Sequence, residues 1–343
     1  MEGRIANHVA AFAMALDAFA THGPTRADLD IVAVGHRVVH GGELFSASVL
    51  IDDDVLAAIG DLIPLAPLHN PANLDGIAGA REHFPELPHV AVFDTVFHQS
   101  LPEPAYTYAL PRDWVADHAI RRYGFHGTSL SFVSRAAASL LGKAQDEVDL
   151  IVAHLGNGAS LTAVRGGESV DTSMGMTPLE GLVMGTRSGD VDPALHAHLQ
   201  RELGWSLDEI DRILNRESGL KGMAGENDFR EVLRMRAEGS EAAALAFDVY
   251  YHRLRKYVGA YYAVLGRVDA IVFTGGVGEN AAPVRATTLE GLGRLGVVVD
   301  PDLNATRSGA ARAISTPDSE VSVLVVPTNE EWEIAQQSVA VIS

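Results

Sequence analysis

Two arginines stand in sequence surroundings that favour anion binding. Arg37 follows a short apolar run, and Arg187 lies in a glycine-rich loop. A guanidinium group forms paired hydrogen bonds with a carboxylate or a phosphate, so both side chains are candidates to bind such a group. Each arginine could instead form an ion pair with a nearby acid, for example Glu43 or Asp190. The residues alone leave both possibilities open.

A glycine-flanked asparagine at Asn157 offers a second way to bind an anion. An apolar run ends at His154 and Leu155, and Gly156 and Gly158 flank the asparagine. In such a turn the backbone amides can approach an anion closely, and the Asn157 amide can bond to it. Because Asn-Gly is also the commonest hairpin turn, this segment taken alone favours a plain hairpin.

A second glycine-rich segment, 275–281, matches the Gly-x-Gly-x-x-Ala pattern of dinucleotide-binding proteins. Asp300 follows about twenty residues later, where a ribose-binding acid would stand. This pattern predicts, as an alternative, an NAD-dependent oxidoreductase. The chain contains no Gly-x4-Gly-Lys-Ser/Thr signature, which argues against a P-loop NTPase.

Two carboxylates and two histidines complete the set of candidate site residues. Asp94 ends an apolar run, where an acid is costly unless it is paired or functional, and it is a candidate to orient Mg²⁺ or an acceptor group. Glu330 could hold Mg²⁺ through water, although a glutamate in the first turn of a helix is also favoured by the helix dipole. His126 and His69 could each donate a hydrogen bond to a developing charge.

Short β-branched runs alternate with longer helical patterns along the chain, which predicts an α/β fold. Ligands in such sheets bind beyond the carboxyl ends of the strands. The longest predicted helix begins after Ser240 and ends at Gly266. Strands are predicted at 31–34, 89–93, 150–155, 160–164, 269–274 and 321–326, and helices near 5–20, at 72–83, after Thr128, in several segments of 192–266, and after a cap at Thr328 or Asn329.

The length of the chain indicates two domains. It has 343 residues, and a domain averages roughly 150 residues. We place the boundary near residue 147. On this division residues 1–147 form an N-terminal lobe, which the C-terminal helix 330–343 joins, and residues 148–329 form a C-terminal nucleotide-binding lobe.

The composition excludes several classes of protein. There are 26 Lys and Arg against 45 Asp and Glu, a formal net charge of −19, which repels nucleic acid and anionic membranes. The absence of cysteine excludes disulfides and thiolate metal sites. No apolar run reaches the length of about 18 residues that spans a membrane, and the first twenty residues show a helical pattern rather than that of a signal peptide. We therefore expect a cytoplasmic protein that binds neither nucleic acid nor membrane.

Eight segments, in this order, together resemble the acetate kinase family over nearly the whole chain. They are GHRVVHGGE, LAPLHNP, VFDTVFH, RRYGFHGTS, HLGNGAS, DTSMGMTPLEGLVMGTRSGDVDP, FTGGVGEN and PTNEE. This family belongs to the superfamily of acetate and sugar kinases, Hsp70 and actin. The resemblance implies two actin-like, ribonuclease H-like lobes around an ATP cleft, and a homodimer. It implies reversible in-line transfer of the γ-phosphoryl group of ATP to acetate, with Mg²⁺ or Mn²⁺.

The same resemblance implies a role for each candidate residue. It assigns Arg37 and Arg187 to the acetate carboxylate and the transferring phosphoryl group, and His126 as a donor to that group. It assigns Asp94 and Glu330 to positioning and magnesium. The implied ATP site comprises His154, Gly156, Asn157, Gly158, Asp228, Phe229, Arg230, Gly276, Gly278 and Asn280, and the implied acetate methyl pocket comprises Val39, Leu68, Phe125 and Pro178, with His69 in a supporting role.

Two features depart from the family pattern. The family opens with a strand and a glycine-serine phosphate turn of the form N-x-G-S-S-S-x-K, whereas this chain begins at a helix that the family reaches later. We therefore expect an incomplete N-terminal lobe and reduced activity. Leu130 replaces the last histidine of the family's GFHGTSH motif. The alternatives are a propionate or butyrate kinase, the NAD-dependent oxidoreductase, and a catalytically inactive nucleotide-binding module.

Overall fold

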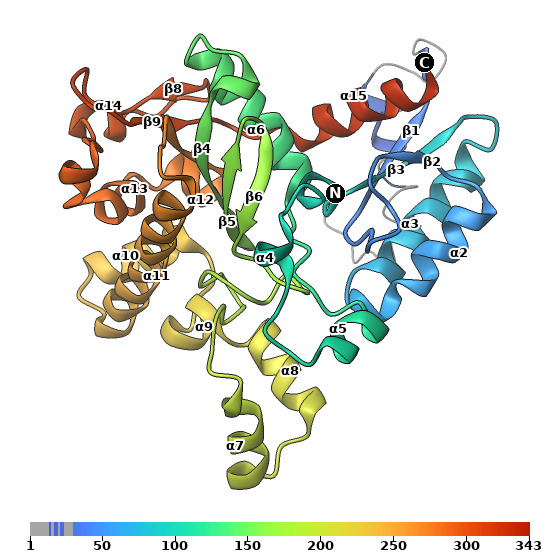
Figure 1. Cartoon of the computed structure of the whole chain (residues 1–343), viewed down its shortest axis with the longest axis horizontal. Helices are drawn as coiled ribbons and strands as arrows, with labels where there is room; N and C mark the ends of the chain where they lie inside the picture. The colour runs from blue at the N-terminus through green and yellow to red at the C-terminus, as the bar shows by residue number, and fades with distance from the viewer. Residues whose placement is uncertain (1–13, 15–16, 20, 24–29) are drawn as a thin grey trace. The chain divides into compact units, whose positions relative to one another are not determined.

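The computed structural model describes residues 14, 17–19, 21–23 and 30–343 (Figure 1). The helix predicted near residues 5–20 therefore falls largely outside the described residues. Contacts within the chain define two compact units. The first contains the residues up to Gln99 together with Asn329–Ser343, and the second contains Ser100–Thr328.

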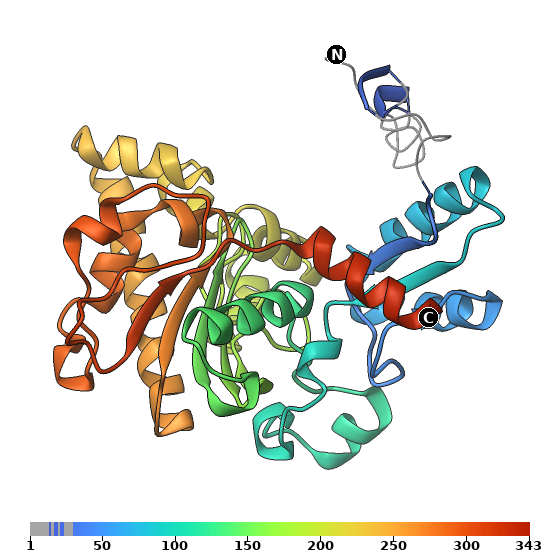
Figure 2. The ribbon, with the colours of Figure 1, turned by 90° about the horizontal axis from the view of Figure 1, so that it is seen from above.

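The first unit contains a three-stranded sheet with the strand order β1-β3-β2. β1 (Val34–Val38) and β3 (His89–Phe93) are parallel, and β2 (Val49–Leu50) is antiparallel to β3. Helix α15 (Glu330–Ile342) packs against β1 and β3 (Figure 2). This unit also contains the helices α2 (Asp53–Asp61), η2 (Ile63–Leu65), α3 (Asn70–His83) and η3 (Val96–His98).

The two parallel strands of this sheet differ in how well the sequence predicted them. β3 is buried along its whole length, as its apolar run predicted. The strand predicted at 31–34 is wrong in position, because β1 spans Val34–Val38 and contains Arg37. In β1 the side chain of Arg37 is exposed and Val38 is buried. Polar residues on one face are compatible with a strand whose other face is buried, so they do not end it.

The second unit contains a six-stranded sheet with the order β6-β5-β4-β7-β9-β8. β7 and β9 are parallel to β4, whereas β5 is antiparallel to β4, β6 to β5, and β8 to β9. β4 and β7 are almost entirely buried, which is typical of the central strands of a sheet covered on both faces. The strands are β4 (Asp149–Leu155), β5 (Ala159–Arg165), β6 (Glu168–Thr172), β7 (Ala270–Thr274), β8 (Arg312–Ala313) and β9 (Ser322–Val325).

Two long helices pack on this sheet. Helix α6 (Gly127–Leu140) contacts β4 and β7, and α11 (Glu241–Leu265) contacts β4 and β5. As predicted, Ser240 caps the start of α11 by accepting a hydrogen bond from Ala243 N, and Gly266 ends it. No helix among the described residues is both long enough and apolar enough to span a membrane. The remaining helices are α4 (Glu103–Tyr106), α5 (Arg112–His118), η4 (Gln145–Glu147), α7 (Ala194–Leu203), α8 (Leu207–Arg216), α9 (Gly219–Ala224), α10 (Phe229–Ala237), α12 (Gly275–Asn280), α13 (Ala282–Leu289), η5 (Leu292–Leu295) and α14 (Pro301–Ala305).

The division into compact units does not coincide with the lobe boundary predicted near residue 147. The units separate between Gln99 and Ser100, because α6 and its neighbours pack against the second sheet. Helix α15 groups with the first unit. The assignment of residues 1–147 and 148–329 to two lobes stays a prediction.

The central strands β4 and β7 bring the two predicted glycine segments to one edge of the sheet. His154 near the end of β4 is in register with Thr274 at the end of β7. The segments that follow the two strands therefore leave the sheet side by side. Gly275 has a φ of 76°, and a Cβ there would lie 2.9 Å from the Leu155 backbone. Only glycine fits at this crossing.

A pair of histidines links β1 to β3 in the first unit. His36 Nε2 lies 2.8 Å from His89 Nδ1, and His89 Nε2 lies 3.0 Å from the Phe84 carbonyl oxygen. A carbonyl only accepts, so His89 Nε2 carries its proton and His36 donates to His89 Nδ1. Burial, His89 and Arg81 together lower the pKa of His36 from its ordinary 6.5 to about 4. The His36 ring is therefore neutral at pH 7.

We predict that this pair makes the stability of the protein depend on pH. The unfolded chain binds a proton to His36 near pH 6.5 and the folded chain only near pH 4, so folding stability is full above pH 6.5 and falls as the pH decreases toward 4. Between pH 7 and 5 the loss attributable to His36 should be about 1–2 kcal/mol. Urea unfolding of the wild type and of His36→Gln at both pH values measures it. Equal pH dependence in the two proteins would contradict the assignment.

Candidate active site

The turn between β4 and β5 forms the centre of the candidate site. Leu155 pairs with Ala159, so the turn has three residues, and Gly156 N donates to the Gly158 carbonyl oxygen over 2.9 Å. The hairpin that the sequence favoured is therefore confirmed, and its turn comprises Gly156, Asn157 and Gly158. Asn157 accepts from Gly185 N at its backbone oxygen and from Asn227 Nδ2 at its side-chain oxygen.

The side chains of Arg187 and His126 both face Gly158. A Cβ added at Gly158 would lie 3.3 Å from Arg187 Nη1 and 3.5 Å from His126 Nε2. Because Gly158 has no side chain, the space in front of Arg187 Nη1 and His126 Nε2 is open. A glycine turn next to a guanidinium and an imidazole is suited to an anion that approaches the backbone closely.

Arg187 is a partly buried cation without a carboxylate partner among the residues that the structure describes. Its Nη1 makes one long hydrogen bond, 3.5 Å, to the Pro178 carbonyl oxygen, and burial lowers its pKa. The alternative pairing with Asp190 is wrong, because the Asp190 carboxylate accepts from Gly181 N and Tyr257 Oη and lies 3.4 Å from Arg253. A desolvated charge of this kind is costly unless an anion compensates it.

Backbone hydrogen bonds hold the loop that carries Arg187. Met184 N donates to the Arg187 carbonyl oxygen, and residues 214–221 pair with residues 184–188 on both sides of it. Gly185 is required here, because a Cβ would lie 2.0 Å from the Asn157 side-chain oxygen. The loop is thereby fixed against the turn between β4 and β5.

His126 adopts a backbone conformation that is uncommon outside glycine. Its φ of 62° and ψ of 21° are left-handed, and it occupies the N-cap position of α6. Its ring stacks on His154 with centroids 4.1 Å apart, and its Nδ1 lies 2.9 Å from Ser160 Oγ. Backbone strain of this kind persists where the surroundings hold it and is concentrated at functional sites.

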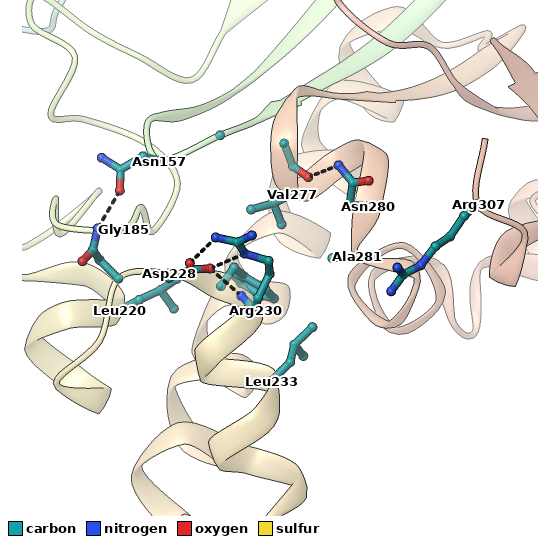
Figure 3. A pocket seen from close by; sticks show the side chains of 14 residues that line it. Asn157, Gly185, Leu220, Asp228, Arg230, Leu233, Val277, Asn280, Ala281 and Arg307 are labelled. Carbon is teal, nitrogen blue, oxygen red and sulfur yellow. Dashed lines mark hydrogen bonds and ion pairs between the residues drawn. The ribbon is translucent and has the colours of Figure 1, made fainter. Parts of the chain in front are cut away.

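A cavity of about 860 Å³ opens beside this turn (Figure 3). Its size is in the range of nucleotide and other small-molecule sites. The side chains of Leu220, Phe229 and Val277 contribute apolar surface. The full lining is Gly156, Asn157, Gly185, Leu220, Asn227, Asp228, Phe229, Arg230, Leu233, Gly276, Val277, Asn280, Ala281 and Arg307.

Two polar pairs lie in the wall of this cavity. Arg230 forms a bidentate ion pair with Asp228, with N–O distances of 3.0 and 2.6 Å. Asn280 Nδ2 donates to the Gly276 carbonyl oxygen, which fixes the side chain at the cavity edge. Figure 3 shows Arg230 and Arg307 rising from different segments beside the same cavity.

Most of the residues predicted to bind ATP line this cavity, and three do not. Gly158 lies beside Arg187 and His126 instead, and His154 is buried beneath His126. Gly278 is buried, and a Cβ there would contact the backbone of Phe273 and Ala153. Its small size serves the packing of α12 against β4 and β7.

The dinucleotide-binding alternative loses its distinguishing features. The segment that matches the glycine pattern is itself helix α12, which begins directly after β7, rather than a loop before a helix. Asp300 caps α14 by accepting hydrogen bonds from Asp302 N and Leu303 N. The acid expected on a ribose is therefore a helix cap outside the cavity lining.

In the first unit Arg37 and Asp94 form a bidentate ion pair. Nε and Nη2 of Arg37 donate to the two carboxylate oxygens over 3.0 and 2.5 Å. The Asp94 side chain is 2% exposed and that of Arg37 42%, so the buried acid holds an accessible guanidinium. The alternative partner Glu43 is wrong. The charge of Asp94, foremost, raises the pKa of Arg37.

Glu330 provides a carboxylate suited to Mg²⁺ in the same unit. Burial raises its pKa, and the nearby charge of Asp94 raises it further, so a cation would be favoured there. No cluster of three or more His, Cys, Asp or Glu side chains within the described part of the chain could hold a metal by itself. Mg²⁺ commonly keeps several waters and takes only one or two protein carboxylates, which a single glutamate fits.

The predicted methyl pocket remains a prediction. Val39 and Phe125 are buried, at 5% and 1% exposure, and Leu68 is 46% exposed. Val39, Leu68 and His69 belong to the first unit, and Phe125 and Pro178 to the second.

Sequence reasoning missed several residues that shape the site. Ser160 and Asn227 each lie inside or beside a recognised motif but were not singled out. Arg285 is 1% exposed, and its guanidinium donates to the carbonyl oxygens of Gly278 and Glu279 at the end of α12. The sequence carries no signal for it, because an arginine in a helical pattern is usually exposed.

Comparisons with known proteins agree on one family. The chain matches the Acetokinase family over residues 1–336. It is 60% identical over 338 residues to an acetate kinase of Streptomyces avermitilis, covering 98% of this chain and 84% of the relative. It is 59% identical to an acetate kinase of Clavibacter michiganensis subsp. michiganensis, covering 98% of this chain and 85% of the relative.

Solved structures give the same result for the fold. A crystal structure of Porphyromonas gingivalis acetate kinase superposes with a TM-score of 0.92 at 43% identity, covering 100% of this chain and 87% of that one. A propionate kinase from Francisella tularensis gives a TM-score of 0.91 at 47% identity, covering 97% and 84%. The predicted α/β, actin-like fold class is confirmed. The chain belongs to the acetokinase family, the family of the acetate kinases.

Proposed function

We propose that this chain transfers the γ-phosphoryl group of ATP to acetate, giving acetyl phosphate and ADP, and catalyses the reverse transfer. Family membership supports the proposal, as do the names of its acetate kinase relatives. The observation that carries it is Arg187, a partly buried cation that faces Gly158 and His126 beside a nucleotide-sized cavity.

The cavity beside Gly156 is the proposed ATP site. Its apolar surface suits a purine, and the polar groups of Asp228, Arg230 and Asn280 lie at its wall. The phosphates would extend toward the turn at Gly156–Gly158, where backbone amides and the side chains of Arg187 and His126 can receive them.

Acetate needs no general base. It is already an anion at pH 7, whereas a hydroxyl acceptor must lose a proton. The obstacle is repulsion between acetate and the triphosphate. We assign Arg187 and Arg37 to neutralise this repulsion, with Asp94 holding the Arg37 guanidinium in place.

The transfer is proposed as a direct in-line displacement. An acetate oxygen forms a bond to the γ-phosphorus as the bond from that phosphorus to the β-phosphate oxygen breaks, and ADP leaves. Arg187 and the Nε2 of His126 stabilise the charge on the equatorial oxygens. Mg²⁺ or Mn²⁺, when bound, neutralises phosphate charge, and Glu330 is the residue proposed to hold it.

Propionate is the second candidate acceptor, because one structural relative at 47% identity is a propionate kinase. One methylene group is worth about 1–3 kcal/mol of discrimination. Purified enzyme should show a kcat/KM for acetate at least tenfold above that for propionate. A ratio below one would make propionate the physiological class of acceptor. Nucleotide binding with no transfer to either acid would favour the inactive binding module.

We also propose that the protein is a cytoplasmic homodimer, as the family resemblance implies. Light scattering coupled to gel filtration should give twice the chain mass of 36.5 kDa. A mass of one chain would contradict the dimer.

Replacing Arg187 should separate activity from stability. We predict that Arg187→Ala lowers the rate of acetyl phosphate formation roughly 100-fold or more, because it removes an electrostatic stabiliser of the transferring group. The melting temperature should stay equal or rise. The substitution removes a desolvated charge, and among the described residues it breaks no ion pair with a carboxylate. A coupled assay and thermal unfolding measure the two effects.

The matched control is Arg212→Ala. Arg212 is an exposed arginine paired with Glu217 and does not line the cavity, so the variant has the same net charge change outside the site. It should keep wild-type turnover. Near-normal transfer by folded Arg187→Ala would remove Arg187 from the reaction.

A methyl group placed in the cavity should weaken nucleotide binding. A Cβ at Gly276 meets no protein atom within 4 Å, and this glycine lines the cavity. Gly276→Ala should therefore fold normally and bind ATP fivefold or more weakly. The added methyl group would crowd the bound nucleotide, which costs about 1–3 kcal/mol of binding free energy. Calorimetric titration measures the affinity.

Gly259→Ala is the corresponding control. Gly259 lies in α11, where an added Cβ also meets no atom within 4 Å, and it is not one of the residues that line the cavity. Its ATP affinity should match the wild type. If both variants bind ATP equally well, the nucleotide does not occupy this cavity.

A further inference from the structure

We propose that Ser160 is a positioning residue that fixes the tautomer of His126, keeping the ring proton on Nε2. The proposal rests on the proposed function, in which His126 donates a hydrogen bond to the transferring group. It concerns an atom that does not touch the substrate, and it makes a strand residue part of the catalytic design.

The hydroxyl of Ser160 is buried where it meets the partly buried ring of His126. Ser160 is the second residue of β5 and is 0% exposed, and its Oγ lies 2.9 Å from His126 Nδ1. Its strand is paired on both sides, with β4 and β6. The sheet therefore holds the backbone that carries the hydroxyl in place.

The direction of this hydrogen bond follows from the partners available to the hydroxyl. Among the described residues, His126 Nδ1 is the one atom that the Ser160 hydroxyl bonds. If Nδ1 carried the proton, the hydroxyl would accept, and its own hydrogen would be buried without a partner, at a cost of about 1–3 kcal/mol. If the hydroxyl donates, Nδ1 is the acceptor and the proton lies on Nε2.

The other side of the ring is consistent with this assignment. Nε2 faces Gly158, and Arg187 Nη1 faces the same position. A neutral imidazole that donates there adds a donor without adding a second cation beside the guanidinium. The opposite tautomer would present a lone pair to the incoming phosphoryl oxygens, which repels them.

The neighbouring histidine shows why Ser160 differs from other buried serines. His154, stacked on His126, has its Nδ1 2.8 Å from Ser129 Oγ, which also lies 2.7 Å from Thr328 Oγ1. With two partners, the Ser129 hydroxyl can either donate or accept toward His154, so it fixes no tautomer. Ser160 has one partner and one favourable direction.

The test reads the ring nitrogens directly. In protein labelled with ¹⁵N-histidine, long-range ¹H–¹⁵N spectra distinguish protonated from unprotonated ring nitrogens, and the His126 signals are assigned by their loss in His126→Asn. We expect a protonated Nε2 and an unprotonated Nδ1 in the wild type. A protonated Nδ1 would overturn the proposal without any variant, and this outcome is independent of whether the protein is a kinase.

Two variants then connect the tautomer to the rate. Ser160→Ala should give a mixture of tautomers and lower kcat tenfold or more, with the KM for ATP changed less than twofold. Thr162→Val removes another hydroxyl that is 0% exposed on β5, one that bonds Thr172 and no histidine, and should keep both the His126 spectrum and kcat. A folded Ser160→Ala protein with an unchanged spectrum or unchanged kcat would refute the role.

Discussion

The partly buried charge of Arg187 is the interaction on which the design of the second unit depends. Its side chain has no carboxylate partner among the described residues, and burial alone shifts its pKa downward. Burying a charge in this way lowers the stability of the free protein, and the binding of an anionic ligand offsets the loss. The acidic chain as a whole repels anions, with a net charge of −19, so attraction must be local. The guanidinium, the imidazole of His126 and the amides of the glycine turn supply it.

Missing side chains are as important to this arrangement as those present. Gly158 leaves the space that Arg187 and His126 face, and Gly185 permits the loop to lie against Asn157. The acids of the region have other tasks, since Asp190 binds Gly181 N and the Tyr257 hydroxyl, which ties the loop to α11. Because the carboxylate of Asp190 binds these groups, it does not neutralise the Arg187 guanidinium. The positive charge of Arg187 is therefore available for a ligand.

What the sequence predicted well depends on neighbouring residues, and most of what it missed depends on contacts with distant segments. The cap at Ser240, the end of α11 at Gly266 and the buried β3 follow from neighbouring residues, and all three are correct. The position of β1 was wrong because the polar Arg37 was taken to end a strand. The partner of Arg187 could not be decided, because it depends on where Tyr257, 67 positions from Asp190, places its hydroxyl. Ser160 and Arg285 could not be singled out either, since their importance comes from burial against distant segments.

The left-handed backbone at His126 carries a consequence for how sequences at this position evolve. Glycine and asparagine tolerate a φ of 62° better than histidine does. Selection for folding alone would therefore favour glycine or asparagine over histidine at this position. A saturation library at this codon, sorted once for soluble expression and once for growth that depends on turnover, would give two different residue profiles. The difference between those profiles would measure how much conformational cost natural selection has tolerated to keep one aromatic ring in place.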